Sequence, residues 1–89
     1  MKGFQMKDEE QKIYFRNYER IPAERELDIL IRELKSAGFQ VGEKRITGLV
    51  DLYECKKDHI RFDIIFTGEE SFVYSDDKEA IKILMELFK

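Results

Sequence analysis

Cys55 and His59 are the only thiol and the only imidazole in this 89-residue chain, so a nucleophile paired with a general base must use both. Such a pair works only within hydrogen-bond reach. A predicted hairpin turn lies between them. With that turn at 57–58, Cys55 lies opposite Ile60 and His59 points to the other face of the sheet. The spacing predicts a structural cysteine and no catalytic dyad. One thiol and one imidazole are also too few for a closed zinc site, so we expect no enzyme, metal or cofactor.

Four carboxylates bracket a predicted strand at 71–75; they are Glu69, Glu70, Asp76 and Asp77. At about 3.3 Å per residue the two pairs lie roughly 16 Å apart along the strand. In one interpretation the first pair occupies a solvated turn and the second favours a helix N-terminus through the helix dipole. In the other, the acids and Phe72 or Tyr74 between them form an edge that docks on a basic surface of a protein partner. Glycosidase chemistry would require a cleft, which we do not expect in a chain of this length.

The first predicted strand carries Tyr14 and Tyr18 on the same face as Arg16 and Arg20. Aromatic rings interleaved with arginines can stack on bases, although the pattern also suits an ordinary outer sheet face. The net charge is −3, and residues 22–89 hold eleven Lys and Arg against fifteen Asp and Glu. A nucleic-acid binder requires a basic face, so nucleic acid is only the alternative partner. It would contact Arg16, Arg20, Lys56, Lys57 and Arg61.

The sequence predicts a helix at about 22–37, and the strands around it must position the candidate residues described above. Pro22 suits the first helical position, because its missing N–H would be unpaired there. Glu24 can reach back to the Ile21 N–H as in a capping box. Gly38 can adopt the left-handed conformation that ends a helix in a Schellman motif. The apolar stripe consists of Ala23, Leu27, Leu30, Ile31, Leu34 and Ala37.

Alternating apolar residues predict strands at about 12–21, 40–46, 49–57, 60–67 and 71–75. The strands at 49–57 and 60–67 form a hairpin around Asp58, with a two-residue turn at 57–58 or 58–59. Either turn gives the same core face, which consists of Leu49, Tyr53, Cys55, Ile60, Phe62, Ile64 and Phe66. The register of 71–75 stays open: either Phe72 and Tyr74 or Val73 faces the core.

A last helix is predicted from Asp76 to Lys89, because Asp76 and Glu79 have the spacing of a capping box. Its apolar residues form a stripe wider than one sheet face needs; they are Ala80, Ile81, Ile83, Leu84, Met85, Leu87 and Phe88. We therefore expect this helix to contact the first helix or a second copy of the chain. The predicted dimer interface contains Ile83 and Leu87.

The predicted order is strand, helix, three or four antiparallel strands, helix. This order is typical of an α+β two-layer sandwich, with an antiparallel sheet and two helices on one of its faces. Residues 1–10 show no period and are expected to be a loose lead-in to a single domain at 11–89. The chain has one cysteine, no apolar run near eighteen residues and no signal-peptide pattern. We therefore expect a soluble, cytoplasmic protein that does not contact a membrane.

The order of elements over residues 22–88 resembles the double-stranded-RNA-binding domain. His59 followed by Phe62 is similar to the histidine and downstream aromatic residue of that family's first hairpin. Lys78-Glu79-Ala80 resembles part of the start of its last helix. Asp76 and Asp77 stand near the family's phosphate-binding lysines and would repel phosphate, so the resemblance implies the topology rather than RNA binding.

Two further segments resemble the small acidic phage-encoded anti-CRISPR proteins that inhibit type II effector nucleases. They are Leu30-Ile31-Arg32-Glu33-Leu34-Lys35 and Phe72-Val73-Tyr74-Ser75-Asp76-Asp77. Those inhibitors share the helix, sheet, helix order and offer carboxylates to the basic groove that reads the PAM. The resemblance implies that Glu69, Glu70, Asp76 and Asp77 are the matching acids. The leading hypothesis is therefore a non-enzymatic module that docks its acidic edge on a basic protein surface; a nucleic-acid-binding domain is the alternative.

Overall fold

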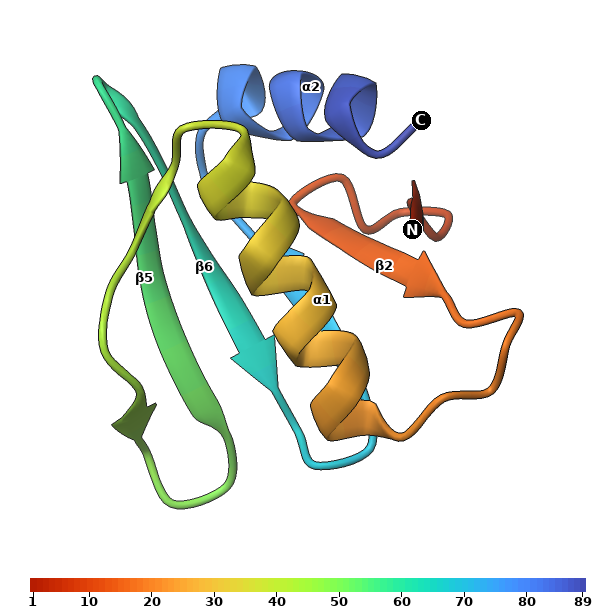
Figure 1. The fold of residues 1–89 in the computed structure, drawn as a ribbon. Coiled ribbons are helices and arrows are strands. Elements are labelled where there is room, and N and C mark those ends of the chain that lie inside the picture. Colours follow the sequence, from red (N-terminus) through yellow and green to blue (C-terminus); the bar gives the residue numbers. More distant parts are fainter.

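The computed structural model describes residues 1–89 as an antiparallel sheet of seven strands with two helices, so the predicted α+β class is confirmed. Figure 1 shows α1 lying across the sheet and α2 near one of its ends. The strands occur in the order β1-β2-β7-β6-β5-β3, and β4 also pairs with β5. The elements are β1 (Lys2–Phe4), β2 (Lys12–Arg16), α1 (Ala23–Ser36), β3 (Gln40–Val41), β4 (Arg45–Ile46), β5 (Asp51–Lys57), β6 (Ile60–Phe66), β7 (Ser71–Tyr74) and α2 (Lys78–Leu87).

Strand β7 lies in the interior of the sheet, between β2 and β6, so the acidic residues predicted to form a docking edge around 71–75 do not lie on an edge strand. The reason is a long-range pairing: Ile13 of β2 lies opposite Val73 of β7. Local alternation cannot reveal such a partner. The true edges are β1 on one side and β3 with β4 on the other, and each of these strands has at most three residues.

The first ten residues are not a loose lead-in, because Lys2–Phe4 forms β1 and pairs with β2. The Gly3 N–H donates to the Phe88 carbonyl at 2.8 Å, which joins the two ends of the chain. A Cβ on Gly3 would lie 2.9 Å from Cγ2 of Ile13, so the missing side chain allows this close approach. A three-residue strand is too short to show a period in the sequence.

Helix α1 begins at Ala23, with Pro22 preceding it, and the expected capping box is absent. Asn17 instead brackets Ile21: its Oδ1 accepts the Ile21 N–H at 3.0 Å, and its Nδ2 donates to the Ile21 carbonyl at 2.8 Å. Asn17 and Ile21 are four positions apart in the chain, whereas the two residues of a capping box are three positions apart. Asn17 therefore holds the chain's entry into α1.

The Schellman ending of α1 is confirmed. Gly38 has a φ of +94°. The Phe39 N–H donates to the Leu34 carbonyl and the Gly38 N–H donates to the Lys35 carbonyl, both at 3.0 Å. This is the hydrogen-bond pattern of the motif, and it satisfies two carbonyls at the helix end.

Helix α2 is capped by Asp77 rather than Asp76. The Asp77 carboxylate accepts the Glu79 N–H at 2.9 Å. The Asp76 carboxylate accepts instead from Gln11 Nε2 at 2.9 Å and from the Tyr74 hydroxyl at 2.8 Å. The helix thus starts one residue later than the sequence spacing predicts. The Asp76 carboxylate is therefore available to accept hydrogen bonds from side chains of the sheet and of the segment before β2.

The core is one cluster of 16 buried side chains, to which both helices and strands β2, β5, β6 and β7 contribute. The hairpin turn lies at Asp58 and His59, so Cys55 is opposite Phe62. Leu49 does not join the core. It is 93% exposed because the turn closed by Thr47 extends to Val50, and β5 starts only after it.

Candidate protein-binding face

The sheet has one face packed against the helices and an opposite face, here the outer face, that no helix covers. Val73 is fully buried on the helix side, which places Phe72 and Tyr74 on the outer face. Five half-buried apolar side chains cross the outer face from β1 to β5, each opposite the next in the strand register. This outer-face row consists of Phe4, Tyr14, Phe72, Ile65 and Leu52.

The three rings of the outer-face row are in contact along it. The centroids of Phe4 and Tyr14 are 6.0 Å apart, and those of Tyr14 and Phe72 are 5.3 Å apart. The Arg16 guanidinium lies 5.1 Å from the Phe4 centroid, and Lys12 Nζ lies 5.3 Å from that of Phe72. Tilted pairs at these distances are favourable, and the cations add to them while keeping their charge near solvent.

An acidic triad of Glu54, Asp63 and Asp76 borders one side of the outer-face row. Asp63 lies directly opposite Glu54 on one neighbouring strand and opposite Tyr74 on the other. Burial raises the pKa of the Asp63 carboxyl, and the charges of Glu54 and Asp76 raise it further, while Arg45 opposes them. Like charges placed opposite each other on a sheet are destabilising.

Two bonds tie the triad to its surroundings. Arg45 forms an ion pair with Glu54. The hydrogen bond from the Tyr74 hydroxyl to Asp76 raises the pKa of Tyr74 and fixes that phenol beside the triad. Neither contact supplies a cation to Asp63, which has no salt bridge.

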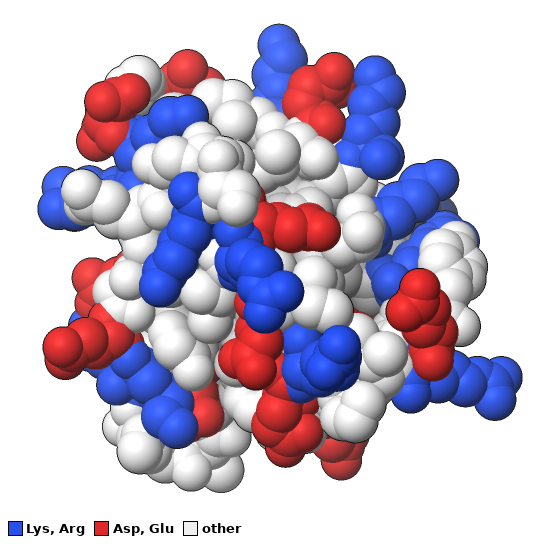
Figure 2. Space-filling model, in the orientation of Figure 1, with Lys and Arg blue, Asp and Glu red and all other residues white.

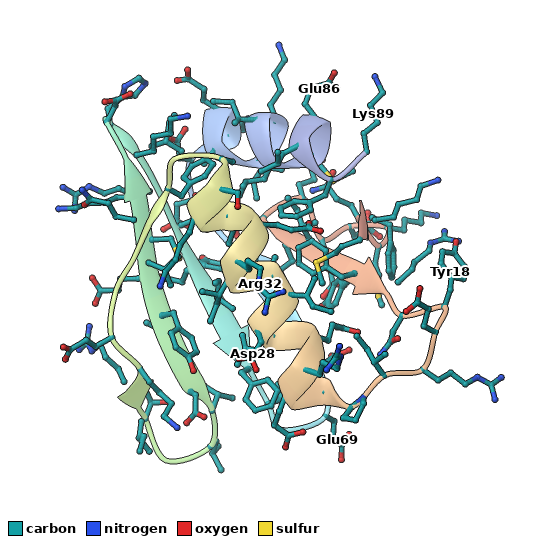
Figure 3. The ribbon with its side chains drawn as sticks, viewed as in Figure 1. Tyr18, Asp28, Arg32, Glu69, Glu86 and Lys89 are labelled. Atoms are coloured by element: carbon teal, nitrogen blue, oxygen red, sulfur yellow. The ribbon has the colours of Figure 1, made fainter.

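The structure divides the six predicted partner-binding residues. Phe72, Tyr74 and Asp76 come together on or beside the outer face. Glu69 and Glu70 lie in the turn before β7, at the opposite end of that strand, and Figure 3 shows Glu69 at the end of the sheet remote from α2. Asp77 is occupied as the cap of α2. Because β7 is an interior strand, these acids do not form an edge of the sheet as predicted.

Sequence reasoning missed Glu54, Asp63 and Phe4 as site residues. The alternation in β5 and β6 placed the first two opposite the core, but their proximity to Tyr74 depends on β7 lying next to β6. Phe4 belongs to the segment that was expected to be loose. No local signal identifies either relation.

Cys55 and His59 form no dyad, but the predicted reason is wrong, because His59 contacts Glu79 of α2 on the helix side of the sheet, where Cys55 is also buried. The Cys55 thiol instead donates to the Tyr53 carbonyl at 3.6 Å. Cys55 is 3% exposed, and burial raises the pKa of its thiol to about 12, with the charge of Asp63 adding to the effect. His59 lies in the turn and contacts Glu79 at 3.3 Å. This arrangement provides no activated nucleophile.

The basic residues considered for nucleic acid are dispersed. Arg16, Lys56 and Arg61 share the outer face, but Lys57 donates to the Ala37 carbonyl at 2.9 Å on the helix side. Figure 2 shows the helix-bearing face, where blue and red side chains are interspersed without a large region of one sign. No group of three His, Cys, Asp or Glu side chains is placed to hold a metal ion. Neither helix has the length and apolar character needed to cross a membrane.

The chain matches no protein-family model, no curated protein and no solved structure. The two family resemblances therefore stay predictions.

Proposed function

We propose that this protein is a non-enzymatic binding module whose outer sheet face docks on a basic surface of a protein partner. The observation that carries the proposal is the outer-face row, which spans five strands with no element of the chain over it. Inhibition of a nucleic-acid-handling protein, the function implied by the anti-CRISPR resemblance, is the sharpest form of the proposal.

The composition of the outer face supports a protein partner. Aromatic side chains at the centre of a surface, surrounded by charged and polar groups, are typical of protein interfaces. Phe72 lies in the middle of the row, between Tyr14 and Ile65. A central, half-buried aromatic ring is the kind of residue that contributes most to binding energy.

The acidic triad supports a basic partner. Burial and the charges of Glu54 and Asp76 raise the pKa of the Asp63 carboxyl, so the ionised form of Asp63 lacks stabilisation within the chain. An arginine or lysine from a partner would stabilise this charge, and a carboxylate from a partner would worsen it. The net charge of −3 also favours a positively charged partner.

A tagged chain used in pull-downs from host lysate tests the proposal, with captured proteins quantified for each variant. Phe72→Ala and Asp63→Asn should each lower capture of the same partner at least about tenfold, because central anchors and unpaired charges dominate interfaces. Asp28→Asn is the matched control, since Figure 3 shows Asp28 on the side of α1 that faces away from the sheet.

The purified partner then allows a direct measurement of affinity against salt concentration. The affinity of the unmutated chain should fall as salt rises, and that of the Asp63→Asn variant should fall less steeply. Glu69→Ala with Glu70→Ala should leave the affinity unchanged. Equal capture and equal affinity for the Phe72 and Asp63 variants and the unmutated chain would show that the outer face is not the binding surface.

Binding of single-stranded nucleic acid is the second candidate, because the Phe4, Tyr14 and Phe72 rings carry Arg16 and Lys12 above them. Successive rings beside cations can stack bases. The acidic triad on the same face opposes this reading, since it would repel phosphate. A mobility shift on single- and double-stranded RNA that weakens steeply with salt would favour nucleic acid over the protein partner.

A further inference from the structure

An apolar groove lies beside α2, on a different part of the molecule from the outer face. It has a volume of about 340 Å³ and is bounded by α2, the end of α1 and the β5–β6 turn. Its apolar lining consists of Ala37, Phe39, Ile60, Ile83 and Leu87. For comparison, an apolar cavity of about 150 Å³ is large enough to bind benzene. The groove therefore has room for more than one aliphatic side chain.

Most of the wide apolar stripe of α2 is consumed inside the chain. Ala80, Ile81, Leu84 and Phe88 are buried in the core cluster. Ile83 and Leu87 remain 38% and 42% exposed. They are four residues apart, so they lie next to each other on the helix surface. The same small region thus offers both projecting apolar side chains and the groove beside them.

We propose that a second copy of this chain covers the groove, in a symmetric dimer in which Leu87 of each copy enters the groove of the other. A two-fold axis brings one surface against itself, so it requires a surface that contains both a projection and a recess. The Ile83 and Leu87 side chains beside the groove meet that requirement. This proposal does not depend on the proposed function.

The charges around the groove also suit a second copy. Its polar lining consists of Lys57, Asp58, His59 and Glu79. Lys57 is already bonded to the Ala37 carbonyl, and His59 contacts Glu79 at 3.3 Å. A rim that carries charges of both signs does not repel its own copy, whereas it offers little to a strongly basic or acidic partner.

Pairing between sheet edges is the competing route to a dimer, and the topology disfavours it. Strand β7 is interior, and the edge strands have no more than three residues each. Short edge strands are a common device against edge-to-edge association. A dimer through the α2 groove would leave both outer faces open, so one dimer would present two equivalent binding faces.

Sedimentation equilibrium of the full chain between about 1 and 300 µM tests the proposal. The unmutated protein should approach twice its chain mass of 10.7 kDa within this range. Leu87→Glu should raise the dimer dissociation constant by about a hundredfold or more, because both copies lose a buried leucine. Ile83→Lys should act in the same direction. Leu49→Glu is the control, since Leu49 is 93% exposed in the turn between β4 and β5.

Circular dichroism melts of every variant show whether it is folded, and the partly exposed positions of both helix residues make folded variants the expected result. A monomer across the whole concentration range would overturn the proposal. So would a dimer that survives Leu87→Glu and Ile83→Lys but dissociates with Phe72→Glu, because that result would place the contact on the outer face.

Discussion

At the scale of single residues, Asp63 has an environment that opposes its negative charge. Its folded pKa is raised by burial and by Glu54 and Asp76. A carboxyl with a raised folded pKa binds its proton more tightly in the folded state, so ionisation destabilises the fold. The penalty is present above the folded pKa and disappears as the pH falls below the unfolded value of about 3.9.

Asp63→Asn should therefore stabilise the protein at pH 7. The gain should be at most about 0.5–1 kcal/mol, because solvent screens this partly exposed site. Urea unfolding at pH 7 and near pH 3 measures it, and the difference between variant and unmutated protein should vanish at the lower pH. A gain that persists at low pH would show that charge is not its cause.

The same substitution is expected to weaken partner binding while it stabilises the fold. This opposition is the usual signature of a residue kept for function at some expense of stability. Asp28→Asn on α1 should change neither property.

Cys55 should be nearly inert to thiol reagents in the folded protein. Its pKa of about 12 leaves almost no thiolate at pH 8, and the side chain is 3% exposed. Labelling with Ellman's reagent should be at least about a hundredfold slower than in guanidinium chloride, where the thiol returns to its ordinary pKa of about 8.5. Rapid labelling without denaturant would mean that β5 opens locally.

At the scale of elements, the two adjacent aspartates before α2 have different roles. Asp77→Ala should cost about 1 kcal/mol of unfolding free energy, because the variant leaves the Glu79 N–H without its acceptor. Asp76→Ala should cost less stability but should weaken partner binding, since Asp76 holds the Tyr74 hydroxyl beside the acidic triad. Urea unfolding and the binding assay compare the two variants. Equal stability losses would contradict the assignment of the cap to Asp77.

At the scale of the whole molecule, Phe88 joins the two ends of the chain. Its ring is 1% exposed and packs edge-on against Phe15 at 5.1 Å, and its carbonyl accepts the Gly3 N–H. Phe88→Ala should lower the unfolding free energy by about 3–5 kcal/mol, a large part of the stability of a small domain. Urea unfolding measures the loss, and hydrogen exchange should show that β1 becomes unprotected. Retained protection of the Gly3 amide would contradict this coupling.

The features that depend on residues a few positions apart were predictable. The Schellman ending at Gly38, the stripe of α1 and the alternation of Ile60 to Phe66 agree with the structure, because each is set by backbone geometry and local periodicity. The start of α2 was wrong by one residue, since two adjacent aspartates can both serve as a cap.

The features that depend on which strands become neighbours were not predictable. Pairing of β2 with β7 placed β7 in the interior of the sheet, so the predicted docking edge is not an edge strand. The same pairing placed Tyr14 beside Phe72, the pairing of β1 with β2 placed Phe4 beside Tyr14, and the pairing of β6 with β7 placed Asp63 beside Tyr74. The paired residues of β2 and β7 are about sixty positions apart in the chain, and those of β1 with β2 and of β6 with β7 are about ten apart. Alternation assigns a side chain to a face of the sheet but does not identify the strand beside it. The composition of each strand was therefore readable in the chain, whereas the binding face arises only when long-range pairing brings the strands together.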